Sequence, residues 1–180
     1  MKQVPLLSRP LEIGAISDAG REEHVVATEA ERAAIAAEHK LISVDRLEAD
    51  LDIRRSGAEL VVIDGRLRAK VVHTCVVSLD PAPQTIDETF HISFVMAGSR
   101  QAPAEPKPGA EVLVDPESDQ PDVIPGSSID LGAVVLEHFS LALDPYPRAP
   151  GAALPPEAPD GDAGPESPFA ALAALKARKG

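Results

Sequence analysis

The chain has 180 residues, a net charge of −12 at neutral pH, a single cysteine and no tryptophan. This length suits one domain with tails, and the acidic charge argues against direct binding of naked nucleic acid, which needs clustered Lys and Arg. A single cysteine excludes an internal disulfide and favours a reducing compartment. No apolar run has the length of a signal peptide or a transmembrane helix, so we expect a cytoplasmic protein that does not bind a membrane.

The first part of the chain predicts two short strands and one helix. Residues 11–13 and 24–26 are the strand candidates. Thr28 and Glu31 have the spacing of a capping box, in which each side chain bonds the backbone amide of the other residue. We therefore expect a helix that begins at Thr28 and ends near His39.

Three longer strands follow the helix. Residues 46–54 alternate between apolar and charged side chains, which is typical of a half-buried strand. Residues 59–77 predict a second strand, in which Asp64 and Gly65 mark either a bulge or a tight hairpin. The third strand has its core at residues 90–96. Together they predict an antiparallel meander with one packed face.

Proline-rich segments separate the ordered parts of the chain. The 18 prolines are about twice the average usage, and they cluster. We expect a single domain over residues 1–148 with a flexible insertion at 97–122, followed by a disordered linker at 149–167. Residues 168–180 predict a short helix that either docks on the domain or binds a partner.

The stretch 129–148 predicts a capped helix that ends in a corner. Asp130 is a suitable N-cap, and Pro145 enforces the end of the helix. The helix is apolar around most of its circumference, so we expect it to pack on more than one side and to be core from Leu131 to Leu143. His138 lies within the apolar arc and is interpreted as a histidine at the edge of the packing.

The corner after this helix is the candidate interaction site. It consists of Asp144, Pro145, Tyr146, Pro147 and Arg148. The two prolines fix its shape before a partner binds. Tyr and Arg are the side chains most often found at binding hot spots, so we expect the corner to contact a partner.

The sequence marks no catalytic residue, no metal ligand set and no cofactor site. His73 and Cys75 share a face of a strand, but one Cys and one His do not fill a tetrahedral metal site. A thiol nucleophile needs a base and an orienting group, and no candidates stand out. We interpret Cys75 as a buried structural residue.

Three segments of the chain carry a family resemblance. Residues 65–81 are GRLRAKVVHTCVVSLDP, the helix begins with IDL, and residues 168–176 are PFAALAALK. In this order and spacing they resemble the YceD family of large ribosomal RNA subunit accumulation proteins, in its alphaproteobacterial branch. The motif positions carried over are Cys75, Ser78, Asp130, Leu131, Pro168 and Phe169.

This chain departs from the family pattern in its cysteines. Many relatives carry C-x-x-C where this chain has Cys75 and Ser78, and further cysteines where it has residues 149–152. We therefore expect no metal at these positions.

We expect an α+β fold, with an antiparallel sheet of about five strands covered by two main helices. The resemblance implies a non-enzymatic factor in large-subunit biogenesis that supports the accumulation of large-subunit rRNA. The acidic charge favours a basic ribosomal protein or a pre-ribosomal particle as partner. The alternatives are an enzyme, either a nuclease or thiol-dependent, and an adaptor that acts through its disordered segments.

Overall fold

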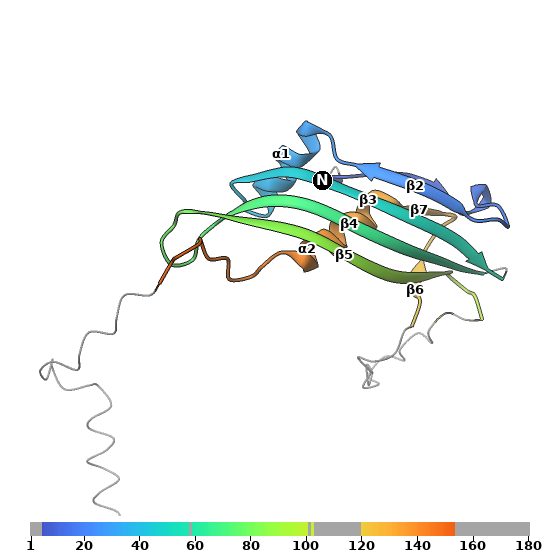
Figure 1. The fold of residues 1–180 in the computed structure, drawn as a ribbon. Coiled ribbons are helices and arrows are strands. Elements are labelled where there is room, and N and C mark those ends of the chain that lie inside the picture. Colours follow the sequence, from blue (N-terminus) through green and yellow to red (C-terminus); the bar gives the residue numbers. More distant parts are fainter. Residues whose placement is uncertain (1–4, 58, 101, 103–119, 154–180) are drawn as a thin grey trace, which may run out of the picture.

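The computed structural model describes residues 5–57, 59–100, 102 and 120–153, and in them the chain forms an α+β fold. A five-stranded sheet has the order β2-β3-β4-β5-β6, and β1 pairs with β7 in a small second sheet (Figure 1). The elements are β1 (Pro10–Glu12), a 3-10 turn (Ile13–Ala15), β2 (Arg21–Val26), α1 (Glu29–Glu38), β3 (Ser43–Ser56), β4 (Leu60–Thr74), β5 (Pro81–Met96), β6 (Asp122–Ile124), β7 (Ser128–Asp130) and α2 (Leu131–Ala142).

The predicted fold class and number of strands are confirmed, but the sheet is mixed. Strands β2 to β5 are antiparallel neighbours, as expected of a meander. Strand β6 instead runs parallel to β5, with Asp122 opposite Phe94. A parallel pair cannot be joined by a tight hairpin, and residues 97–121 provide the longer connection that it needs. The predicted linker 149–167 and helix 168–180 lie mostly or wholly outside the described residues.

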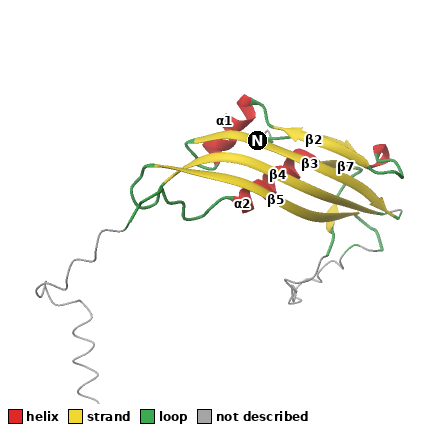
Figure 2. Cartoon of the chain, in the orientation of Figure 1, coloured by secondary structure: helices red, strands yellow, loops and turns green. Residues whose placement is uncertain are grey.

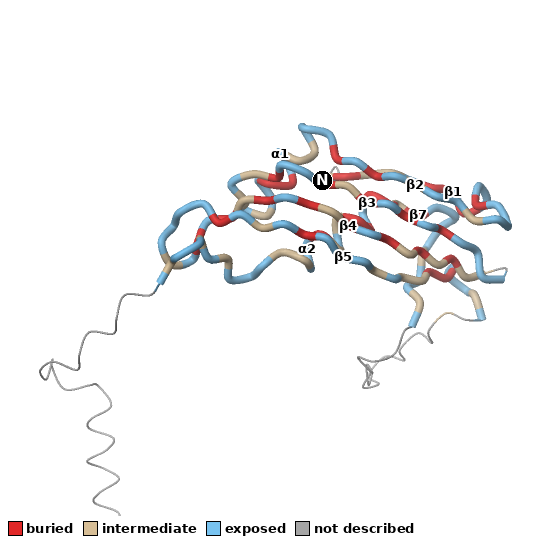
Figure 3. The backbone as a smooth tube through the Cα atoms, in the orientation of Figure 1, coloured by how far each residue is buried: buried red, intermediate tan, exposed pale blue. Residues whose placement is uncertain are grey.

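One face of the sheet is covered and the other is open. Figure 2 shows α1 and α2 on the same side of the strands. Burial alternates along β4, as Figure 3 shows, because successive side chains point to opposite faces. Strands β3 and β4 contribute many of the fully buried side chains, among them Leu47, Ile53, Ile63 and Leu67. The open face carries the charged residues of the alternating pattern.

The capping box predicted at the start of α1 is present. The Glu31 amide donates to Thr28 Oγ1 at 3.3 Å, and the Thr28 amide donates to Glu31 Oε2 at 2.7 Å. The helix ends at Glu38 with His39 as its C-cap, as the sequence predicts. Local side-chain chemistry therefore defines the start of this helix.

The bulge or hairpin expected at Asp64 and Gly65 is absent, and that prediction is wrong. Strand β4 runs without a break, and Gly65 pairs with Leu51 on one side and Phe90 on the other. A Cβ atom on Gly65 would lie 2.2 Å from Cζ of Phe90. The glycine is present because the Phe90 ring lies across the strand at this point, and not because the chain turns.

Helix α2 packs on two sides, as its wide apolar arc predicts. Its first turn meets the N-terminal segment so closely that a Cβ on Gly132 would lie 2.7 Å from the Leu7 carbonyl oxygen. Further along, α2 contacts β4 and β5, and Phe139 is fully buried in the core. The prediction that the core extends to Leu143 is wrong at Leu141, which is 76% exposed. Leu141 follows Phe139 by two residues, which places it about 200° around the helix.

Candidate functional site

The predicted interaction corner is held against the turn that joins β4 to β5. The amide of Val76, in that turn, donates to the Pro147 carbonyl at 2.9 Å. The Tyr146 amide donates to the Asp144 carboxylate at 2.8 Å, which closes the corner on itself. The Tyr146 side chain is 75% exposed, and Arg148 is exposed as well. The corner is therefore anchored by its backbone and presents its side chains to solvent.

Gln84 connects the corner to the sheet, a role that the sequence does not indicate. The side-chain amide of Gln84 donates to the Ala142 carbonyl at 2.9 Å, at the end of α2. Its Oε1 accepts from the Asp144 amide at 3.2 Å and lies 2.7 Å from Nε2 of His73 on β4. One side chain of β5 thus joins β4, α2 and the corner. No sequence pattern marked it, because Asp144 lies 60 residues further along the chain.

Cys75 and Ser78 lie in the turn after β4, directly beside the corner. The turn is closed by a bond from the Cys75 amide to the Asp80 carbonyl at 2.8 Å. The Cys75 sulfur accepts from the Val77 and Ser78 amides, each at 3.4 Å. Hydrogen bonds from the side chain and amide of Ser78, and from the backbone of Ala149, lower the pKa of the Cys75 thiol to about 6.

The surroundings of Cys75 explain what its side chain does. The residue has no exposed surface, and its sulfur accepts hydrogen bonds from the backbone of the β4–β5 turn and from the backbone of Ala149, directly after the corner. Such a sulfur acts as a hydrogen-bond acceptor that shapes the turn. His73, its neighbour on the strand, is also buried and is engaged with Gln84. Among the residues that the structure describes, no group of three or more His, Cys, Asp or Glu side chains has the arrangement of a metal site.

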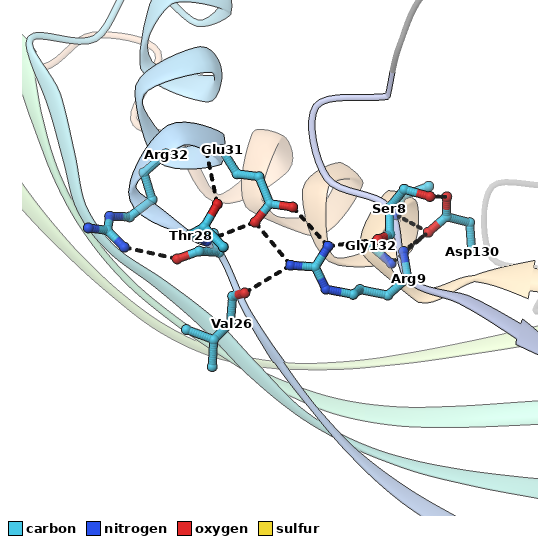
Figure 4. A network of polar contacts seen from close by, with 10 residues as sticks. Ser8, Arg9, Val26, Thr28, Glu31, Arg32, Asp130 and Gly132 are labelled. Carbon is cyan, nitrogen blue, oxygen red and sulfur yellow. Dashed lines mark hydrogen bonds and ion pairs between the residues drawn. The ribbon is translucent and has the colours of Figure 1, made fainter.

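Asp130 and Leu131, the motif positions at the start of α2, both bond the N-terminal segment: the Leu131 amide donates to the Arg9 carbonyl at 3.0 Å, and Figure 4 shows Asp130 beside Ser8 and Arg9. The Asp130 carboxylate accepts from Ser8 Oγ at 2.6 Å and from the Arg9 amide at 2.7 Å. It also caps α2 by accepting from the Gly132 amide at 3.0 Å. Burial raises the pKa of Asp130, but the bonds from Ser8, Arg9 and the helix amides outweigh it, and the pKa lies below the usual value. Leu131 is buried in the core.

Arg9 continues this network to α1. Its guanidinium binds both oxygens of Glu31, at 2.8 and 3.0 Å, and donates to the Val26 carbonyl at 3.2 Å. The bond from Arg9 is the main reason that the pKa of Glu31 is lowered to about 2. Ser8, Arg9, Glu31 and Asp130 therefore form a polar clasp between the two helices and the N-terminal segment. The carboxylates of Asp130 and Glu31 are already bonded to groups of the same chain, so the clasp holds the fold together and is not a binding site.

The open face of the sheet holds a shallow trough of about 870 Å³. Its lining includes His24 and Asp50, whose Nδ1 and Oδ1 atoms lie 2.7 Å apart, and Asp64 and His91, which are paired at the same distance. Arg66 in the trough binds the Asp87 carboxylate with two bonds of 2.8 Å. These polar groups already have partners within the chain, so the trough offers less to a partner than the exposed corner does.

The structure therefore brings together part of the predicted set of site residues. Residues 144–148 meet Cys75 and Ser78 at one end of the sheet, whereas Asp130 and Leu131 belong to the clasp. Pro168 and Phe169 lie outside the described residues. No helix in the described part of the chain is long and apolar enough to cross a membrane.

Comparison with known proteins gives one match. The model of the YceD family, described as large ribosomal RNA subunit accumulation protein YceD, matches residues 63–176. This range includes the turn, the corner and the C-terminal motif. A search of curated proteins gives no match, and neither does a search of solved structures.

Proposed function

Because the chain belongs to the YceD family of large ribosomal RNA subunit accumulation proteins, we propose that it supports accumulation of large-subunit rRNA by binding a ribosomal protein or a pre-ribosomal particle. The family description supports a role in ribosome biogenesis. The proposed mechanism is binding without catalysis. Its partner is basic, or is a protein–RNA assembly that presents a basic protein surface.

The observation that carries this proposal is the anchored and exposed corner. Tyr146 and Arg148 are presented on a backbone that is fixed by Pro147, Asp144 and Gln84 before any partner arrives. A side chain held in place loses little entropy on binding, and an exposed Tyr combines apolar area with a polar hydroxyl. The corner is therefore suited to recognition of a protein surface.

Charge supports a basic partner. The whole chain carries −12, and opposite potentials accelerate encounter and exclude wrong partners. Ribosomal proteins that bind RNA are rich in Lys and Arg, so an acidic factor complements them. The buried Cys75 supports binding without thiol catalysis, because thiol chemistry needs an accessible sulfur.

The test compares the wild-type chain with the double variant Tyr146→Ala and Arg148→Ala. We expect the variant to fold and to recover at least about tenfold less ribosomal protein or pre-ribosomal particle in pull-downs at low salt, as the loss of two hot-spot side chains implies. Cells that carry it should show a reduced ratio of large- to small-subunit rRNA. Ile42→Ala, at another site that is 52% exposed, is the matched control. Wild-type recovery by the double variant would remove the corner from the mechanism, and a wild-type chain that recovers neither partner would overturn the function.

A further inference from the structure

Large apolar side chains are exposed at the corner and at the turn beside it. Val76 is 52% exposed, Leu79 is 76% exposed and Tyr146 is 75% exposed. Their backbones are tied together, because the Val76 amide bonds the carbonyl of Pro147, the residue after Tyr146. We call Val76, Leu79 and Tyr146 the apolar corner surface. Single exposed apolar residues are common, but a group on two joined segments is typical of a surface that is covered by another segment.

Leu79 gives the clearest sign that this surface is used. Its backbone has φ of 64°, the left-handed conformation, which is strained for a bulky side chain. Gly or Asn would adopt this turn with less strain and would expose no apolar side chain. The turn therefore carries both conformational strain and the exposure of a leucine. This combination is expected where the side chain serves an interaction.

The C-terminal part of the chain begins at this same end of the sheet. The described chain ends at Ala153, and Figure 1 shows residues 145–153 beside the β4–β5 turn. Residues 154–167 can span up to about 45 Å when fully extended. The motif at 168–176 is thus tethered within reach of the corner, and a tethered segment has a high effective concentration at its site.

The chemistry of the C-terminal motif complements the surface. Phe169, Leu172 and Leu175 have the spacing of one helical face. Basic residues follow at positions 176, 178 and 179. On the side of the fold, Asp80, Asp144 and Arg148 are all exposed and leave a net negative charge around the surface. An apolar strip with a basic end therefore matches an apolar surface with an acidic border.

We propose that residues 168–176 dock as a short helix on the apolar corner surface of the same chain. The docked helix covers Leu79 and part of Tyr146, and its basic end lies toward Asp80 and Asp144. The family match extends from residue 63 to residue 176, so the surface and the docking segment belong to one matched unit. A partner that binds the corner then meets a surface built from both segments, or displaces the helix. The docking itself does not depend on the proposed function.

The chain contains its own probe for this contact. Tyr146 is the only tyrosine and tryptophan is absent, so the intrinsic fluorescence of the full chain reports on the corner alone. Quenching by acrylamide measures how accessible the ring is. The described fold leaves Tyr146 75% exposed, so a helix that covers half of this area lowers the quenching constant about two-fold.

The test compares two sets of substitutions in the full-length chain. Phe169→Ser, Leu172→Ser and Leu175→Ser together remove the apolar strip, whereas Ala170→Ser and Ala174→Ser alter positions on the opposite side of the helix. We expect the quenching constant to rise about two-fold in the first variant and to stay at the wild-type value in the second. Equal quenching in the wild-type chain and both variants would overturn the proposal.

A second pair of variants tests the surface itself. Leu79→Asn keeps a residue that accepts positive φ, so the turn is preserved while the apolar side chain is lost. It should raise the quenching constant as the triple variant does. Val123→Asn, at an exposed apolar position on β6, is the matched control. If Leu79→Asn leaves quenching unchanged, the helix does not dock on this surface.

Crosslinking identifies the partner segment. A carbodiimide joins a lysine directly to a carboxylate, and we expect crosslinks from Lys176 or Lys179 to Asp80 or Asp144, detected by mass spectrometry. These crosslinks should disappear in the triple variant and should be independent of protein concentration. Crosslinks or quenching that depend on protein concentration would assign the contact to a second copy and overturn intrachain docking.

Discussion

The ring of Phe90 is stacked on the ring of His138, with centroids 3.8 Å apart and an angle of 15° between the planes. Phe90 comes from β5 and His138 from α2, so this contact joins the sheet to the helix above it. On its other side the Phe90 ring covers Gly65 on β4. The Phe90 ring therefore fills the space above Gly65 on β4 and also contacts α2 through His138.

Replacing Gly65 with Ala should destabilise the fold strongly. The new Cβ would lie 2.2 Å from Phe90 Cζ, so the ring must leave its place and the stacking on His138 is lost. We expect a loss of about 3 kcal/mol in the free energy of unfolding, measured by urea denaturation. Gly14→Ala is the control, because a Cβ there meets nothing within 4 Å. Equal stability of the two variants would show that Phe90 moves aside without cost.

The stability of the chain should fall as the pH drops below 7, in part because of His138. Its Nε2 atom is buried without a hydrogen-bond partner, and burial lowers the pKa of the imidazole although Glu137 and Glu88 act in the opposite direction. The unfolded chain therefore takes up a proton near pH 6.5 that the folded chain accepts only at lower pH, which favours unfolding. Urea denaturation from pH 7.5 to 5 measures the effect.

The matched variant is His138→Phe, which keeps a ring for stacking on Phe90 and does not titrate. The difference in unfolding free energy between pH 7.5 and pH 5 should be smaller in this variant than in the wild-type chain. An identical pH dependence would show that His138 keeps its ordinary proton affinity in the fold.

Removing the Asp130 carboxylate should loosen both the helix and the N-terminal segment. Asp130→Ala deletes the cap of α2 and leaves Ser8 Oγ and the Arg9 amide without their acceptor. We expect a loss of about 3 kcal/mol, because the helix cap is removed and two partly buried donors lose their acceptor. Ser8→Ala, which removes one donor and keeps the carboxylate, should cost only about 1 kcal/mol. If both variants lose the same amount, the cap does not contribute.

The amide of Gln84 should control the order of the corner. Gln84→Ala removes the partners of the Asp144 amide and the Ala142 carbonyl, and we expect amide hydrogen exchange at Asp144 to become at least about tenfold faster. The thermal unfolding temperature should change little more than in Thr85→Ala, the neighbouring exposed position. Unchanged exchange at Asp144 would show that Pro145 and Pro147 alone fix the corner.

The thiol of Cys75 should titrate well below its ordinary range. As the only cysteine, it can be followed by the ultraviolet absorbance of the thiolate, with an expected midpoint near its pKa of about 6. Ser78→Ala removes the largest cause of the shift and should raise the midpoint, whereas Ser93→Ala should not. Because the folded pKa lies below the unfolded value of 9.0, this group adds stability as the pH rises from 6 toward 9.

Substitution of Cys75 also separates binding from thiol chemistry. Cys75→Ser should leave rRNA accumulation unchanged once the variant is shown to be folded. Loss of accumulation in a folded Cys75→Ser chain would favour the thiol-dependent enzyme.

The parts of the fold that the sequence predicted are those with local causes. The capping box of Thr28 and Glu31 and the cap at Asp130 involve residues that are close in the chain, and both are confirmed. The alternating pattern likewise identified β3, because the polarity of each residue indicates whether it lies on the buried or the exposed face of the strand.

The remaining features have distant causes. The role of Gly65 depends on Phe90, which is 25 positions away, and no local pattern distinguishes this glycine from one in a turn. Gln84 bonds groups near residue 143 that only the folded sheet brings close. At the candidate site, the sequence indicated the corner through its Tyr, Arg and prolines. It did not indicate that the corner would be anchored to the turn at Cys75, because that contact is made by backbone atoms.

The clasp at Asp130 also bears on the order in which the chain can fold during synthesis. Strand β1 finds its partner only in β7, and Arg9 pairs with a residue 121 positions later. While the ribosome is still making the central strands, the N-terminal segment has no strand partner and its apolar Leu7 and Leu11 have no helix α2 to pack against. The meander of β2 to β5 can assemble first from near neighbours, and the N-terminal segment is secured last. The N-terminal segment therefore gains its strand partner only after β7, one of the last described elements, has been translated.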